Sequence, residues 1–190
     1  MVIDCNVNGK NLDEPQFREF FAVAEELDVP VFLHPRYLPH QEGLERYHLA
    51  NLVGIPFQTT IGVASLIFGG VLDDFPRLKV YLAHAGGCVP YICGRWDQGW
   101  RNVAAARQGN KQTPGHYLRR FHYDTISHSG PALSFLANLV GADRIVLGTD
   151  YPFDVGDYHP FQHIRSLQEM TEEEKQGIIE ENGPRLFGLS

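Results

Sequence analysis

Three side chains that can bind a metal ion or move a proton stand shortly after apolar runs of the sequence. His34 follows "VFL", His84 follows "VYLA", and Asp150 comes three residues after "IVL". Short apolar runs bounded by turn residues are typical of buried strands, and the two glycines after His84 would let the backbone turn there. Because parallel strands end at one common edge of a sheet, we expect these three side chains to gather at that edge.

Imidazole and carboxylate groups in this arrangement indicate metal-assisted chemistry. They are good ligands for a divalent ion such as zinc, which lowers the pKa of its water and polarises a substrate oxygen. A neighbouring histidine can move a proton near neutral pH. A single histidine at a strand end is more often part of the hydrogen-bonded scaffold, so the hypothesis rests on the joint pattern. Asp124 ends a further run, "FHYD", and we expect it to orient a ligand rather than to cap the next turn.

The elements that must position these residues alternate between strand-like and helix-like segments. We expect strands at 2–7, 31–33, 79–83, 121–127 and 145–147, and helices at about 17–27, 56–72 and 131–140. A further helix should contain Trp96 and Trp100, and a polar loop is expected at 36–48. Such alternation predicts a parallel sheet covered by helices, either an open doubly wound sheet or part of a (β/α)8 barrel. The first strand is followed by neither GxGxxG nor GxxxxGK[ST], so the phosphate loop of open-sheet nucleotide folds is absent and the barrel is favoured.

Length and composition fit one domain over residues 1–190, and they exclude some functions. Lys and Arg total 16 against 23 Asp and Glu, which gives a net charge of −7. Without a long basic run, nucleic acid is not expected as a main partner, and we expect no apolar run to reach the roughly 18 to 20 residues of a membrane span. No secretory signal begins the chain, and three cysteines do not suggest a disulfide framework, so a reduced, cytoplasmic protein is expected.

Three motifs carry a resemblance to a known family. The stretches "VFLHP", "AHAGGCVPYICGRWD" and "IVLGTDYPF" resemble the amidohydrolase-related metal-dependent decarboxylases and hydrolases. The N-terminal stretch "VNGKNLDEPQFREFFAVAEELDVPVFLHP" looks like the segment that joins barrel strands four and five in that family. The resemblance covers nearly the whole chain. It implies a partial (β/α)8 TIM barrel in which residues 1–190 correspond to strands four to eight.

The resemblance also implies roles for single residues. His34 and Asp150 would be ligands of a divalent metal, zinc or alternatively manganese, and His84 would be the general base that activates the metal-bound water. Asp150 would also be a candidate proton donor to the carbon that loses carbon dioxide. Arg95 would bind the substrate carboxylate from a neighbouring subunit of a homodimer, a task that suits a guanidinium fork. Phe153, shortly after Asp150, is expected to line the pocket.

The sequence departs from the family in one respect. The family's first strand ends in a His-x-His pair of ligands, and no His-x-His occurs here. His159 and His163 share an i, i+4 spacing, but we expect them at exposed positions of a helix start. Five strands cannot close an eight-strand barrel. The chain could therefore be a fragment, could pair with a chain that supplies the missing strands, or could have lost the complete metal site.

Three functions follow from these residues, in order of preference. The first is decarboxylation of a small carboxylated substrate by a metal-dependent carboxy-lyase. The second is hydrolysis of an ester, lactone or amide at the same edge of the sheet. The third is a non-catalytic, truncated barrel that lacks a complete metal site.

Overall fold

The computed structural model describes residues 1–36, 38–39 and 41–189; the loop expected at 36–48 therefore contains two residues outside this description, Tyr37 and His40. A five-stranded, all-parallel sheet with the order β1-β4-β5-β6-β7 forms the centre of the described chain. Its strands are β1 (Val2–Ile3), β4 (Val31–Leu33), β5 (Val80–Leu82), β6 (Phe121–Asp124) and β7 (Ile145–Val146). The expected α/β class and parallel sheet are confirmed.

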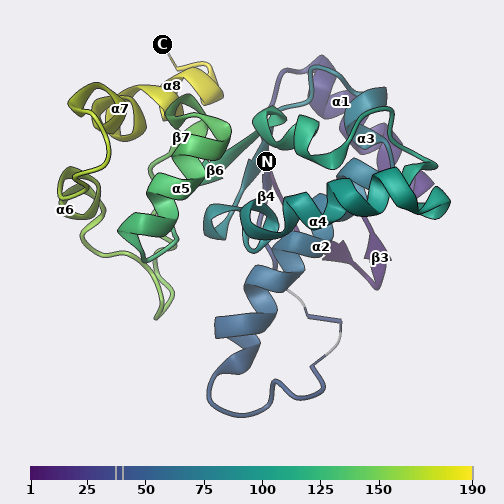
Figure 1. Cartoon of the computed structure of the whole chain (residues 1–190), viewed down its shortest axis with the longest axis horizontal. Coiled ribbons are helices and arrows are strands. Elements are labelled where there is room, and N and C mark those ends of the chain that lie inside the picture. Colours follow the sequence, from purple (N-terminus) through teal and green to yellow (C-terminus); the bar gives the residue numbers. More distant parts are fainter. Residues whose placement is uncertain (37, 40, 190) are drawn as a thin grey trace.

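Helices connect successive strands and cover the sheet (Figure 1). Their bounds are α1 (Arg18–Glu26), α2 (Ile55–Phe68), α3 (Val71–Asp74), α4 (Val89–Asn102), α5 (Gly130–Val140), α6 (Pro160–Arg165), α7 (Glu172–Gln176) and α8 (Asn182–Phe187). In Figure 1, α6, α7 and α8 (yellow) lie at one side and α1 and α3 at the other, while α2 and the residues leading into it (blue) extend downward.

The two faces of the sheet differ in how they are covered. The residues that point to the helical face form the main core: Val31, Leu33, Val80, Leu82, Phe121, Tyr123 and Ile145. On the other face, Phe32 stacks on Tyr81 with ring centroids 4.6 Å apart, and the cover comes from Leu186 and Phe187 of α8. Alternate residues of each strand thus face the helices that connect the strands, on the outer side, or the inner side of the sheet. This is the arrangement of a (β/α)8 barrel strand. The sheet is a partial barrel.

Helix α2 explains why one segment is apolar enough to resemble a membrane span. The continuous helical stretch Ala50–Phe68 has 19 residues and a mean hydropathy of 1.4. Core helices meet the same criterion, and the buried positions of α2 include Val63, Leu66 and Ile67 in the main core. Thr59 and Thr60 of this helix are also buried. The Thr59 hydroxyl lies within hydrogen-bond distance of His84 Nδ1, and the Thr60 hydroxyl accepts the backbone N–H of Cys88. The expectation that no apolar run reaches the length of a membrane span was therefore wrong by length and composition. The stretch is 44% buried, and its buried part packs in the core.

Three expected element bounds were wrong, each for a local reason. The first strand stops at Ile3, because Asn8 and Gly9 adopt positive φ and fold β2 (Asn6–Val7) back on β3 (Lys10–Asn11). Asn-Gly is a strong hairpin signal that the apolar pattern had masked. The long helix ends at Phe68, because Gly70 has φ +71° and separates α3 from it.

The fourth strand ends at Asp124 instead of Ser127. The Asp124 carboxylate accepts the backbone N–H of Ile126, 3.0 Å away, and this bond starts a turn. The same side chain contributes to the site described below.

Candidate metal centre

The carboxyl ends of the strands bring the expected residues to one edge of the sheet. Leu33 of β4 is in register with Leu82 of β5, and Tyr123 of β6 is in register with Ile145 of β7. The ladder continues one residue further, since the N–H of Ala83 donates to the carbonyl of Leu33 at 3.2 Å. His34 therefore leaves the sheet at the same level as Ala83, directly beside His84.

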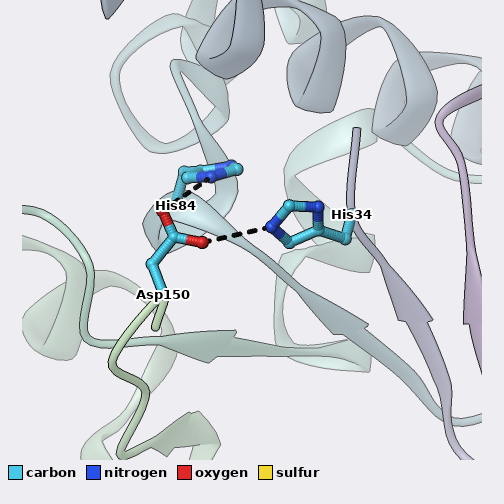
Figure 2. A group of neighbouring side chains, drawn as sticks. All are labelled: His34, His84 and Asp150. Atoms are coloured by element: carbon cyan, nitrogen blue, oxygen red, sulfur yellow. Dashed lines mark hydrogen bonds and ion pairs between the residues drawn. The ribbon is translucent and has the colours of Figure 1, made fainter. Parts of the chain in front are cut away.

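His34, His84 and Asp150 converge on one point (Figure 2). His34 Nε2 lies 3.2 Å from Asp150 Oδ1, and His84 Nε2 lies 3.8 Å from Asp150 Oδ2. The two imidazole centroids are 5.1 Å apart. Side-chain exposures of 16%, 11% and 12% put the group at the bottom of a recess, where water screens charges less than at an open surface.

The backbone reaches this geometry through unfavourable conformations. His84, Ala85 and Asp150 have φ values of 58°, 50° and 53°, in the left-handed region that residues other than glycine rarely adopt. Each such residue costs on the order of 1 kcal/mol or more, and it persists only when neighbouring contacts fix it. Two of the three convergent side chains therefore stand on strained backbone, a feature that clusters at functional sites.

His84 is held as a neutral imidazole. Burial, the largest effect, and the neighbouring His34 together lower the pKa of His84 to about 4, against the opposing effect of Asp150. Its Nδ1 lies 3.4 Å from Thr59 Oγ1, and that hydroxyl also lies 3.3 Å from the carbonyl of Ile55. The Thr59 hydroxyl can thus pair with Nδ1 of His84 in either tautomer, and Nε2 is the ring nitrogen that faces Asp150.

The donor set fits a divalent cation. One ligand atom from each of His34, His84 and Asp150 lies within 4.8 Å of the other two, close enough for all three to reach one ion. His84 Nε2 and Asp150 Oδ2 are 3.8 Å apart, which is too long for a direct hydrogen bond. Two imidazole nitrogens and a carboxylate suit zinc or manganese better than magnesium or calcium, which prefer oxygen ligands alone.

Cavities open on both sides of the three residues. A cavity of about 430 Å³ touches His84 and Asp150 and runs between α2, α4 and α5, where Ile55, Tyr91 and Phe135 contribute to its wall. A second cavity of about 390 Å³ touches His34 and Asp150 on the inner face of the sheet, with Phe32 and Phe153 in its wall.

Of the two expected substrate-binding residues, one lies beside the site and the other does not. Phe153 lines the second cavity and stacks on His34, with ring centroids 6.1 Å apart and an interplanar angle of 22°. Arg95 is exposed on α4 and lines neither cavity, so within one chain it is not brought to the site.

The other candidates are arranged as follows. Asp124 is buried beside the site and bonds the backbone of His84, and His128 is exposed at the wall of the larger cavity. His159 is exposed before α6, as expected, but the expectation was wrong for His163, which is half-buried and pairs with Asp157 at 3.0 Å. Neither belongs to the three-residue group at the carboxyl edge. Thr59 was missed by sequence reasoning, because a threonine within an apolar helix carries no signal of its own.

Comparison with known proteins agrees with this geometry. The sequence profile described as amidohydrolase matches residues 3–189. The chain belongs to the amidohydrolase family. A curated relative of this amidohydrolase is 2-amino-3-carboxymuconate-6-semialdehyde decarboxylase of Dictyostelium discoideum, 39% identical over 188 residues, covering 98% of the chain and 52% of that relative.

Solved structures show the same fold. The 5-carboxyvanillate decarboxylase of Sphingomonas paucimobilis superposes with a TM-score of 0.90 at 26% identity, covering 99% of this amidohydrolase and 58% of that chain. The dihydroxybenzoic acid decarboxylase of Polaromonas sp. JS666, solved with manganese and the inhibitor 2-nitroresorcinol, gives 0.84 at 25% identity, covering 95% and 56%. The chain thus spans about half the length of the relatives and neighbours it matches.

Proposed function

We propose that this amidohydrolase acts as a metal-dependent carboxy-lyase on a small carboxylated substrate. The observation that carries the proposal is the convergence of His34, His84 and Asp150 within 4.8 Å beside a cavity of about 430 Å³. The relatives and structural neighbours are decarboxylases, which favours loss of carbon dioxide over hydrolysis. In this reaction the bond between the carboxyl group and its carbon breaks, carbon dioxide leaves, and a proton joins that carbon.

The residues of this chain would divide the work as follows. His34 and Asp150 would hold the ion, which supplies Lewis acidity when bound. His84 would hold and move a proton at Nε2, since burial keeps its imidazole neutral and Thr59 lies at Nδ1. Asp150 is also the proposed proton donor to the carbon. The stacked ring of Phe153 would limit the substrate's position beside His34.

Arg95 would bind the substrate carboxylate across a homodimer interface. Its exposed position on α4, away from both cavities, is compatible with a contribution only to the site of a second subunit. We propose zinc as the ion, with manganese as the alternative, and a cytoplasmic location. A companion chain that supplies the family's remaining strands is the alternative partner.

Metal analysis and product analysis test the proposal together. The purified chain is offered zinc or manganese, dialysed, and analysed for bound metal; it is then incubated with a panel of small carboxylic acids, esters and lactones. We expect about one ion per chain and release of carbon dioxide from at least one acid. Ring opening or ester cleavage without carbon dioxide would replace the proposal with hydrolysis. Absence of stoichiometric metal would mean that this chain alone has no enzymatic site.

His84→Ala separates the proton-moving role from the ligand role. If His84 moves a proton, the variant keeps its metal and turnover falls by about 10²- to 10⁴-fold, the usual contribution of general acid–base catalysis. Metal content and turnover are measured on the same preparation, with His116→Ala, a histidine outside both cavities, as the matched control. Loss of metal equal to that of His34→Ala would make His84 a ligand.

A further inference from the structure

Two adjacent residues at the end of β6 lie between the segments that carry His84 and Asp150. Asp124 and Thr125 are 4% and 1% exposed, so their polar groups are removed from water. Buried polar side chains are retained when they are fully hydrogen-bonded, and each of these two bonds a different neighbouring segment.

Asp124 binds the turn that contains His84. Its Oδ2 accepts the backbone N–H of His84 at 2.9 Å, and its Oδ1 accepts the N–H of Ala85 at 2.6 Å and that of Ile126 at 3.0 Å. Successive N–H groups of left-handed residues form a concave nest that binds an anion, and here the anion is a side chain of the same protein. Burial raises the pKa of Asp124 to about 6, while the three N–H groups oppose this by favouring the charged form.

Thr125 binds the other segment, the end of β7 that leads to Asp150. Its hydroxyl donates to the carbonyl of Gly148 and accepts the N–H of the same residue, both at 3.2 Å. Gly148 also packs tightly against Asp124, because a Cβ added at Gly148 would lie only 2.9 Å from Cβ of Asp124. The turn at Thr149–Asp150 thus starts from a point fixed against β6.

These two sets of bonds account for the unfavourable backbone of the site. The bonds to Asp124 compensate the left-handed conformations of His84 and Ala85, which turn the imidazole away from the strand axis and toward Asp150. The bonds to Thr125 fix Gly148, two residues before Asp150. Asp150 itself has φ 53°, and its side chain points toward His84. Strain of this kind needs surroundings that determine the conformation more strongly than the residue's own preference.

We propose that Asp124 and Thr125 form a two-sided clamp that sets the separation between His84 Nε2, the proposed proton-moving group, and Asp150, a proposed ligand of the ion. Both are positioning residues, since neither lies among the convergent ligand atoms. The inference rests on the proposed metal centre and adds the residues that fix its dimensions.

The test uses one variant for each side of the clamp. Asp124→Asn keeps the shape but replaces one acceptor oxygen by an NH₂ group, which cannot accept the N–H of the nest. Thr125→Val keeps the shape and removes both bonds to Gly148. Side-chain nitrogen NMR of the metal-free chain reads the tautomer of His84, and titration with zinc reads the affinity.

We expect the two variants to differ in both readouts. Asp124→Asn replaces the single tautomer of His84 by averaged imidazole signals and leaves zinc affinity unchanged, because His84 is proposed to move a proton and not to hold the ion. Thr125→Val leaves those signals in place, because it loosens only the Asp150 side. It weakens zinc binding by about 10- to 100-fold, the usual effect of losing a group that orients a ligand. Thr125→Ser, which keeps the hydroxyl, restores the affinity.

Asn182→Ala is the matched structural control. Asn182 is also buried and donates to two carbonyls, those of Ala142 at 2.9 Å and Ile145 at 2.7 Å, at the opposite end of β7. It should lower the melting temperature without changing the His84 signals or the zinc affinity. If the clamp variants behave like Asn182→Ala, the proposal is overturned.

Two further outcomes are decisive. If Asp124→Asn does not fold, the comparison of Thr125→Val with Thr125→Ser decides the proposal through zinc affinity, and equal affinities overturn it. A wild-type chain that binds zinc but releases no carbon dioxide refutes the proposed decarboxylase and leaves the clamp standing, since activity is not one of its readouts.

Discussion

The two edges of the sheet carry opposite chemistry. At the carboxyl edge, two imidazoles and a carboxylate converge on strained backbone. At the amino edge, a cavity of about 340 Å³ is lined by long cationic side chains: Arg77, Lys79, Arg119, Arg120, Arg144 and Arg185. The chain carries a net charge of −7, so the gathering of cations at one edge is local and does not reflect overall composition.

The difference lies in how each edge satisfies its polar groups. Arg120 donates to the carbonyls of Leu72, Phe75 and Pro76, and Arg119 and Arg144 share the carboxylate of Asp143. These cations of the amino edge thus bond partners from their own chain. At the carboxyl edge, His84 Nε2 and Asp150 lack such a mutual hydrogen bond and suit an external cation. This division follows the rule that barrel function resides at the carboxyl ends of strands and stability at the amino ends.

Asp150→Asn should produce the largest effect, and it should be confined to the carboxyl edge. Asparagine tolerates the left-handed backbone nearly as well as aspartate, so the local fold is kept while the charged ligand is lost. Metal affinity should fall by more than the roughly 100-fold upper value for losing an orienting partner. Unfolding free energy of the metal-free chain should change by less than about 1 kcal/mol.

Competition titration of zinc and urea unfolding measure these two quantities. Asp157→Asn is the matched control, because Asp157 pairs with His163 outside the three-residue centre. A retained affinity in Asp150→Asn would show that the carboxylate is not a ligand and would remove the contrast between the edges.

Arg120→Met should give the reverse result, a loss of stability with no loss of metal. The substitution keeps the apolar stem and removes the hydrogen bonds to the carbonyls of Leu72, Phe75 and Pro76. We expect a destabilisation of about 2 kcal/mol, the order expected when charge-assisted bonds are lost from a partly buried group. Urea unfolding measures it, and Arg101→Met, on an exposed face of α4, should cost at most about 0.5 kcal/mol. Reduced zinc affinity in Arg120→Met would contradict the separation of the edges.

The sequence predicted the positions of strand ends better than the lengths of strands. His34, His84 and Asp150 could be found because each follows a short apolar run, and parallel strands must end at a common edge. The extent of the first and fourth strands was wrong, because hydrogen bonds of single side chains and the Asn8-Gly9 turn end them early. An apolar pattern contains no information about such bonds.

The supporting residues of the site were harder to predict than the convergent ones. Thr59, Thr125 and Gly148 act through contacts between segments far apart in sequence, and nothing in their own neighbourhoods marks them. Asp124 was anticipated because it ends a strand-like run, but its three N–H partners depend on left-handed backbone that only the assembled sheet produces. Pattern thus predicts which groups gather, and tertiary contacts decide how they are held.

The smallest expected effect concerns a histidine on β6 near the amino edge. Burial, the largest effect, together with Arg144 and Lys79 lowers the pKa of His122 to about 4, and Asp143 opposes them. An unfolded histidine has a pKa of about 6.5, so between about pH 6.5 and 4 the unfolded chain binds a proton that the folded chain refuses. The free energy of unfolding should therefore fall as the pH falls through this window.

His122→Phe should make that dependence shallower by at most about 1.4 kcal/mol per pH unit, the contribution of one proton. Nδ1 of His122 is buried without a hydrogen-bond partner among the described residues, so phenylalanine removes no bond there. Urea unfolding of both proteins at pH 7, 6 and 5, without metal, gives the difference in slope, and groups common to both, His84 included, cancel. An unchanged slope would mean that His122 titrates equally in both states, and that the amino edge does not enforce a neutral imidazole as the carboxyl edge does for His84.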